Sequence, residues 1–327
     1  MAETAEQTAA GKESALYPAS QRASGAFLAD REGLLGALFL APAILYIIGL
    51  VGIPFFLAIA FSMSDATVGD ASLDFIGLRN FGRVIQTPQF QRALLNSFLF
   101  TIATQIIVII LANILALALA RDFRGKWLAR TLIILPWATP ISLATLGWKW
   151  ILDSKFSPID WVLQRMGLLG GPDALLGSGL HLTYLGVENL AMSSVILVHV
   201  WRILPLATVI LMAGLTSIPK DILEQAEVDG ARFWRIHFQI SIPMILPIMS
   251  IALLFGLIFT FTDMVVAFVL TRGGPVYYTQ VLPLWAWFKG IDGGNLGEGA
   301  AIALFMFPVL LATAILILRT ARRMEVT

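Results

Sequence analysis

Cysteine is absent from this 327-residue sequence, and charged residues make up only 13% of it. Without cysteine the chain has no disulfide framework, no cysteine-ligated zinc site and no thiol nucleophile. Its net charge of +1 comes with no basic stripe, so we expect no nucleic-acid partner. The three histidines, His181, His199 and His237, fall in three different segments, and we therefore expect no metal site.

Motifs for nucleotide binding and hydrolysis are missing as well. A P-loop needs Gly-x-x-x-x-Gly-Lys-Ser/Thr, whereas Gly11-Lys12 continues with glutamate and Gly125-Lys126 with tryptophan. The sequence contains no His-Glu-x-x-His. Ser178 lacks the glycines two residues before and two residues after it that the Gly-x-Ser-x-Gly of a nucleophile elbow requires. We therefore expect no catalytic residue and no cofactor in this chain, and ATP and magnesium must bind a separate subunit if they are used.

Long hydrophobic runs are what the chain has instead, since 58% of its residues are hydrophobic. About 20 consecutive apolar residues suffice for a helix to cross a bilayer. Six windows meet this requirement, at 34–61, 96–120, 128–152, 192–215, 245–270 and 300–318. The third window is interrupted by Pro136, Pro140 and Lys149. The pattern predicts an all-α membrane protein with six transmembrane helices.

Lysine and arginine near the ends of the spans predict the orientation, because such residues concentrate on the cytosolic side. Tight basic clusters at 121–130 and 319–323 lie directly at span ends and place both termini in the cytosol. Residues 1–30 are polar and rich in alanine and serine, which indicates a disordered cytosolic tail without a cleavable signal peptide. Residues 31–327 form the expected transmembrane domain, with long outer loops at 153–191 and 271–299.

A polar segment at 217–243 separates the fourth and fifth windows on the predicted cytosolic side. Ser217 is a suitable cap for a short helix with Asp221 in its first turn, and Gly230 is suited to end it. A second short run follows, and Pro243 begins the next span. An amphipathic helix lying on the membrane surface and a helical knob that contacts a cytosolic partner both fit this pattern.

The same segment resembles the EAA coupling loop of bacterial ABC-importer permeases. The matching positions carry Glu224, Ala226, Asp229, Gly230, Ile240, Ile242 and Pro243, with Ile242 where leucine is usual. In that family the loop seats in a groove on the ATPase subunit and transmits its closure to the spans. The resemblance implies a polar contact from Glu224 and a sharp turn at Gly230. Small Ala231 permits close approach, and Phe233 and Trp234 are candidate anchors.

Polar residues inside the predicted spans are candidates for the solute pathway, because ionisable groups in a bilayer are costly. Asp263 lies in the fifth window, and His199 and Arg202 share one face of the fourth. Asp263 either pairs with Arg202 as a structural contact or lines a hydrophilic cavity. Lys149, flanked by two tryptophans, fits an interfacial lysine better than a solute contact.

A second block, Leu-Thr-Arg-Gly-Gly-Pro at residues 270–275, looks like the Leu-Thr-x-Gly-Gly-Pro signature of MalF-like permeases of carbohydrate importers. In maltose-type permeases the Phe-polar-polar block before it carries solute contacts, which implies such roles for Phe261, Thr262 and Asp263. Arg272 departs from the pattern, since a small or polar residue is usual there. Tyr184 similarly replaces the common tryptophan.

This resemblance implies the partners and the localisation. The chain would be one permease subunit in the bacterial inner membrane, paired with a homologous permease, two ATPase subunits and an extracytoplasmic solute-binding protein. It would move a sugar or a sugar-like solute by alternating access, and a glycerol-phosphate ester is a near alternative. An ion-coupled secondary transporter would need paired acidic residues, and an intramembrane enzyme would need converging acid and base groups. The sequence shows neither.

Overall fold

The computed structural model describes residues 32–70 and 73–325, and the tail expected over residues 1–30 lies outside this part. Within the described residues every regular element is a helix, apart from two isolated β-bridges. The predicted all-α membrane class is confirmed for these residues. The chain divides into two units, the first ending at Leu57 and the second beginning at Ala58.

The first unit holds one long apolar rod. It consists of α2 (Glu32–Ile47), a π-helical turn η3 (Ile48–Gly52) and the start of α3 (Ile53–Ser62). Together they form a candidate membrane span of 27 residues from Gly36. Its side chains are almost all exposed within the chain. Such a helix is suited to lipid or to another apolar surface rather than to water.

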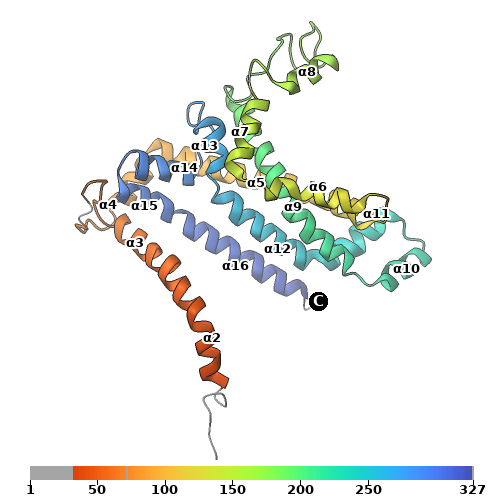
Figure 1. Cartoon of the computed structure of the whole chain (residues 1–327), viewed down its shortest axis with the longest axis horizontal. Coiled ribbons are helices and arrows are strands. Elements are labelled where there is room, and N and C mark those ends of the chain that lie inside the picture. The colour runs from red at the N-terminus through yellow and green to blue at the C-terminus, as the bar shows by residue number, and fades with distance from the viewer. Residues whose placement is uncertain (1–31, 71–72, 326–327) are drawn as a thin grey trace, which may run out of the picture. The chain divides into compact units, whose positions relative to one another are not determined.

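The second unit is built around four long helices (Figure 1). These are α5 (Pro88–Ala120), α9 (Glu188–Thr216), α12 (Ile242–Phe261) and α16 (Met306–Glu325). The most extensive packing joins α5 to α9, while α12 packs against α5, α9 and α16. With the first rod, five described helices are long and apolar enough to cross a membrane.

Helix α5 carries its polar residues inward and its apolar residues outward. Ile102, Ile106, Ile110 and Ile114 recur every four residues and are all more than half exposed. Polar residues occupy the buried face, namely Ser97, Thr101, Thr104 and Gln105. Water would favour the reverse arrangement, whereas hydrocarbon favours isoleucine outside and polar side chains inside the protein, away from lipid. The pattern supports a bilayer environment for this helix.

The predicted third span is broken in the middle. Helices α6 (Lys126–Ala138) and α7 (Ile141–Ile151) meet at an angle of 97° across Thr139 and Pro140. Pro140 has no backbone N–H and forces Thr139 into an extended conformation, so the helix cannot continue. The break falls at Pro140, one of the residues that interrupt the window at 128–152, and the number of candidate spans among the described residues is six only if this bent pair counts as one.

The predicted fifth span also ends early. Helix α12 stops at Phe261, and α13 (Val265–Thr271) begins after a short break. At this break the Asp263 carboxylate accepts a hydrogen bond of 3.1 Å from Val266 N, satisfying a free N–H at the start of α13. The continuous window expected over 245–270 was wrong, and the break brings Asp263 out of regular helix.

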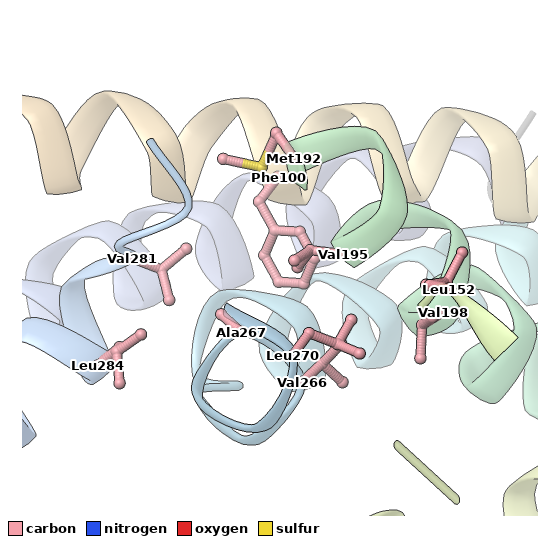
Figure 2. Packing of buried hydrophobic residues seen from close by; sticks show 10 residues of the cluster. All are labelled: Phe100, Leu152, Met192, Val195, Val198, Val266, Ala267, Leu270, Val281 and Leu284. Carbon is pink, nitrogen blue, oxygen red and sulfur yellow. The ribbon is translucent and has the colours of Figure 1, made fainter. Parts of the chain in front are cut away.

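The largest apolar cluster gathers where α5, α9 and α13 meet (Figure 2). Phe100 of α5 lies against Met192 and Val195 of α9 and faces the α13 side chains, among them Val266. The other members are Leu152, Val198, Ala267, Leu270, Val281 and Leu284. This cluster fixes α13 and the following loop to the two longest helices.

Short helices complete the two ends of the second unit. Helices α4 (Arg79–Gln86), α14 (Leu282–Trp287) and α15 (Leu296–Leu304) gather at one end, with the π-helical turn η5 (Phe288–Asp292) between the last two. We call this the α14 end; the opposite end carries α10 and α11 (Figure 1).

A folded loop carries α8 (Pro158–Arg165) between α7 and α9. The buried carboxylate of Asp160 accepts hydrogen bonds from the Tyr184 hydroxyl at 2.7 Å and from Leu182 N at 3.2 Å. Burial, together with this bond to Asp160, raises the pKa of the Tyr184 hydroxyl well above its usual value. Tyr184 therefore stays protonated and ties the end of the loop to α8.

A close approach between α5 and α12 depends on Gly256. A β-carbon there would lie 2.2 Å from the Gln105 side-chain oxygen, so the amide would have to swing away from Thr260. We expect Gly256→Ala to destabilise the protein by about 0.5–2 kcal/mol, because the buried Gln105–Thr260 hydrogen bond is lost. Thermal unfolding in detergent measures this. In a Gln105→Ala background the same substitution should cost much less, and equal costs would contradict the assignment.

Candidate coupling and solute sites

The 217–243 segment begins with helix α10 (Lys220–Val228), at the end of the second unit where the long helices α9 and α12 are connected. Asp221 lies in its first turn, as expected. Ser217 does not cap α10. Its hydroxyl donates to Gly214 O at 2.8 Å, so it closes the preceding helix α9, and Pro219 stands at the start of α10. The expected cap was wrong because Ser217 is used to end α9, and the cap position of α10 falls two residues later, at Pro219.

Gly230 ends α10 in the left-handed conformation, with a φ of +80°. Gly230 N donates to Glu227 O at 3.0 Å, and Ala231 N donates to Ala226 O at 2.9 Å. This pair of bonds is a Schellman motif, in which a left-handed residue satisfies the last carbonyls of a helix. The sharp turn predicted at Gly230 is therefore present in the structure, and it fixes the direction in which the chain leaves α10.

Helix α10 buries one side and exposes the other. Ala226 is buried. Leu223 packs against a cluster of buried apolar residues from α5, α9 and α12 that also includes Ile218. The opposite side forms a shallow concavity lined by Asp221, Glu224, Gln225, Val228 and Asp229. Val228 is 87% exposed. This surface combines three carboxylates with an exposed apolar side chain, which is a combination suited to a protein partner.

A second run follows the Gly230 turn and continues into the bundle without a break. It comprises α11 (Phe233–Ile236), the π-helical turn η4 (His237–Ser241) and α12. Pro243 lies in the first turn of α12, but the π-helical turn carries the helix past it, so the span starts ten residues earlier, at Phe233. Phe233 and Trp234 expose much of their rings, and Ile240 is half-buried.

Two contacts fasten this run to α5. The buried imidazole of His237 donates from Nε2 to Asn113 Oδ1 at 2.8 Å, inside the bundle. The Arg121 guanidinium lies over the Phe233 ring, 5.0 Å from its centroid. Through the Gly230 turn and these two contacts, α10 is connected to α12 along the chain and to α5 across the bundle.

The candidate solute residues divide into paired and unpaired groups. Arg202 Nη1 lies 2.7 Å from Asp263 Oδ2, so the first alternative for Asp263, a pair between α9 and the α12–α13 break, is present in the structure. The Asp263 side chain is almost buried, whereas that of Arg202 is one-quarter exposed. Buried ion pairs of this kind stabilise only when both partners stay in place.

A second polar group is centred on His199, which lies one helical turn from Arg202 on α9. His199 is fully buried and shares a hydrogen bond of 3.1 Å between its Nε2 and Thr260 Oγ1. Thr260 also accepts from Gln105 Nε2 at 2.8 Å. The second imidazole nitrogen of His199 and the hydroxyls of Thr101 and Thr104 are buried without a hydrogen-bond partner among the described residues. Unsatisfied polar atoms at this depth are costly.

The other two predicted solute residues point elsewhere. Phe261 is buried and packs edge-on against Phe98 of α5, with ring centroids 5.6 Å apart. Thr262 is exposed, and its hydroxyl donates to Ile258 O at 2.8 Å. The structure thus brings His199, Arg202 and Asp263 together and keeps Phe261 in the apolar core.

A known family of membrane transport proteins matches the part of the chain that holds both sites. The family described as "Binding-protein-dependent transport system inner membrane component" matches residues 109–326, which include all of α9 to α13. The chain belongs to this family. It is a permease subunit, and a coupling helix with an EAA motif is standard for such subunits.

Individual relatives resemble the permease along most of its length. A probable ABC transporter permease of Brucella suis is 29% identical over 246 residues, covering 75% of this chain and 82% of the relative. The trehalose/maltose permease of Thermococcus litoralis is 27% identical over 292 residues, covering 89% and 95%. A bacterial ABC transporter that imports the acidic polysaccharide alginate has the same fold, with a TM-score of 0.73 at 21% identity over 90% of this chain and 96% of that one.

Several residues of these sites were not expected from the sequence. Gln105, Thr101, Thr104 and Asn113 of the permease all lie in one apolar run, and their spacing places them on the inward side of α5. Polar residues recurring at three- and four-residue intervals in a hydrophobic window were the available signal. Apart from Phe261 and Thr262, which the family resemblance implied, sequence reasoning considered only charged residues and histidines within the spans, so it overlooked these neutral polar ones.

Proposed function

We propose that the permease is the membrane subunit of an ATP-driven importer that moves a sugar or sugar-like solute into the cytoplasm by alternating access. The observation that carries the proposal is the geometry of α10. It exposes carboxylates and Val228 on one side, ends in a left-handed turn at Gly230, and is followed by α11 and η4, which continue into α12 and are hydrogen-bonded to α5. Such an element is suited to transmit a displacement from a bound partner to the membrane helices.

The proposed topology follows from charge together with these helices. The α10 end faces the cytosol, and the α14 end and the α8 loop face the outside, with both termini cytosolic in a bacterial inner membrane. The bent pair α6 and α7 counts as one of six spans. Basic residues support this orientation, since Arg121, Arg124 and Lys126 lie between the end of α5 and the start of α6, where Arg121 lies over the Phe233 ring of α11.

The proposed assembly adds a second permease, two ATPase subunits and an extracytoplasmic solute-binding protein. ATP and magnesium bind the ATPases, and no covalent chemistry takes place in this chain. Glu224, Asp229, Ala231, Phe233 and Trp234 are the proposed contacts with the ATPase or supports of that contact. Each of the solute and the nucleotide must bind one conformation more tightly than the other, because a ligand shifts an equilibrium only by its differential affinity.

The proposed solute class rests on the relatives and on the polar residues at the bundle's centre. The Thermococcus litoralis permease is named for trehalose and maltose, and the alginate importer for an acidic polysaccharide. Sugars need hydrogen-bonding side chains, and Asp263, Arg202 and His199 supply them in one region. We propose that the Arg202–Asp263 pair exchanges its internal contact for solute when the path opens.

An affinity purification of the permease from detergent-solubilised native membranes tests this function. The wild type should bring down an ATPase, a second permease and a solute-binding protein. Glu224→Lys should lose the ATPase, because it reverses one charge on the exposed side of α10. Glu227→Lys is the matched control on the same helix, since Glu227 lines the cavity between α10 and the bundle instead.

Two outcomes would contradict the proposal. A permease that is purified alone or only as a homo-oligomer would remove the ATPase from the mechanism and favour a secondary transporter. Loss of the ATPase in both variants to the same extent would show that the exposed side of α10 has no special part in the contact.

A further inference from the structure

A separate concavity opens at the α14 end of the second unit, away from both sites described above. Its volume is about 760 Å³, and the residues that matter for its chemistry come from the loop after α13 and from α14 and η5. They are two cations, the Gln280 amide and three aromatic side chains, namely Arg272, Lys289, Gln280, Tyr277, Trp285 and Phe288. Thr87 and Gln89 also line the concavity. We call this concavity the mouth pocket.

The charge of the mouth pocket is positive. Arg272 and Lys289 both line it, and among the described residues no carboxylate does. Each cation has an acidic neighbour outside the pocket. Arg272 Nη2 lies 4.0 Å from Asp292 Oδ2, and Lys289 Nζ lies 3.4 Å from Oε2 of the largely buried Glu298. The exposed Arg272 pair is weak, and each neighbour engages only part of its cation, since a guanidinium has five N–H donors and an ammonium group three. Both cations therefore keep donors for an anionic ligand.

An unsatisfied acceptor lies beside the cations. Gln280 is only 4% exposed, and its side-chain oxygen has no hydrogen-bond partner among the described residues. A buried carbonyl oxygen without a donor is costly, and a hydroxyl group of a ligand would satisfy it. The Gln280 backbone is held in place, because Asn96 Nδ2 donates to Gln280 O at 3.0 Å and to Tyr277 O at 2.8 Å.

The loop that forms the pocket wall is held in an unusual conformation. Arg272, Val276 and Tyr277 have φ values of 50°, 42° and 63°, and among the described residues no other non-glycine residue has a positive φ. All three line the mouth pocket. A left-handed conformation is especially unfavourable for the β-branched Val276, and strain of this kind persists only where surrounding contacts impose it. A 2.6 Å hydrogen bond between the Thr271 and Thr279 hydroxyls closes the loop.

We propose that the mouth pocket binds an anionic sugar, one that carries a carboxylate, sulfonate or phosphate group, where the solute enters the permease. The inference rests on the proposed import function. Arg272 and Lys289 bind the anionic group, and the side-chain carbonyl oxygen of Gln280 accepts a hydrogen bond from a sugar hydroxyl. The exposed ring of Tyr277 and the half-buried ring of Phe288 offer flat apolar surfaces for the C–H face of the sugar.

The test is direct binding to the purified transporter complex in nanodiscs, without the solute-binding protein. The probes are D-glucuronate and D-glucose, which differ in one carboxylate, and saturation-transfer NMR measures both. We expect glucuronate to bind at least about tenfold more tightly than glucose. Arg272→Gln/Lys289→Gln should remove this difference. The control pair Lys155→Gln/Arg165→Gln takes the same two charges from the α8 loop and should preserve it.

Three results would overturn the inference. They are equal binding of glucuronate and glucose by the wild type, equal losses in the pocket and control variants, and a pocket variant that loses affinity only for the solute-binding protein. The last result would make the pocket a protein-docking surface. The import function is tested separately. If the ATPase is absent from the complex, the proposal of ATP-driven import fails, but the binding of the two probes can still be compared. If import is normal and the probes bind equally, only the mouth pocket assignment fails.

Discussion

Replacing Gly230 with proline is expected to lower solute transport to roughly one-hundredth of the wild-type rate, since a misplacement of about 1 Å in a positioning element can cost that much. Proline requires a φ near −65°, whereas Gly230 has a φ of +80°, and it removes the N–H that donates to Glu227 O. The turn between α10 and α11 would change direction, and α10 would no longer transmit movement. Reconstituted vesicles measure transport together with solute-stimulated ATP hydrolysis.

Gly230→Asn is the matched control for this variant. Asparagine adopts the left-handed conformation more readily than other side chains, and a β-carbon at Gly230 would meet no atom within 4 Å. This variant should therefore retain most of the wild-type transport, and both variants should insert into membranes in normal amounts. If the proline variant kept solute-stimulated ATP hydrolysis, a coupling role for the turn would be refuted.

Asp263→Ala is the second change with a large expected effect, and we expect at least about a tenfold loss of transport. The substitution leaves the Arg202 guanidinium without its partner and frees Val266 N at the start of α13. Assembly with the partner subunits should survive, because Asp263 lies away from α10. Transport assays in vesicles, with complex recovery measured in parallel, separate the two effects.

A double variant distinguishes the two roles left open for Asp263. Asp263→Ala/Arg202→Met removes both charges and should restore thermal stability, because no unpaired buried charge remains. If Asp263 serves the solute, transport should stay low in the double variant. If the double variant transports normally, the pair is purely structural, and the solute path must be sought elsewhere in the bundle.

The parts of the fold that the sequence predicted are those governed by local rules. Hydrophobic length indicates the membrane helices, and the sequence predicts that Gly230 ends α10, because glycine adopts the left-handed conformation found there at low cost. The exposed position of Glu224 and the burial of Ala226 also follow from the helical period of α10. These features depend on few residues at a time, so a single sequence is sufficient to identify them.

The remaining features depend on contacts between distant segments. The expected continuous helix over 245–270 ends at Phe261, where Asp263 caps α13 and meets Arg202 from another helix. Hydropathy does not reveal this break, because it interrupts the apolar run by only a few residues. The mouth pocket is a similar case. Arg272 was noticed as a departure from the family's usual residue, but its proximity to Lys289 and Gln280 is set by the loop geometry.

The inward polar face of α5 has a consequence for how the protein is made. Synthesis proceeds from the N-terminus, so α5 reaches the bilayer before α9 and α12 have been translated. During that interval Thr101, Thr104 and Gln105 have none of the protein neighbours that surround them in the finished bundle. Bundle closure is therefore a late event after insertion. A substitution on the α9 or α12 side of this interface would expose polar groups to lipid and mark the newborn chain for degradation, without altering a single residue of α5.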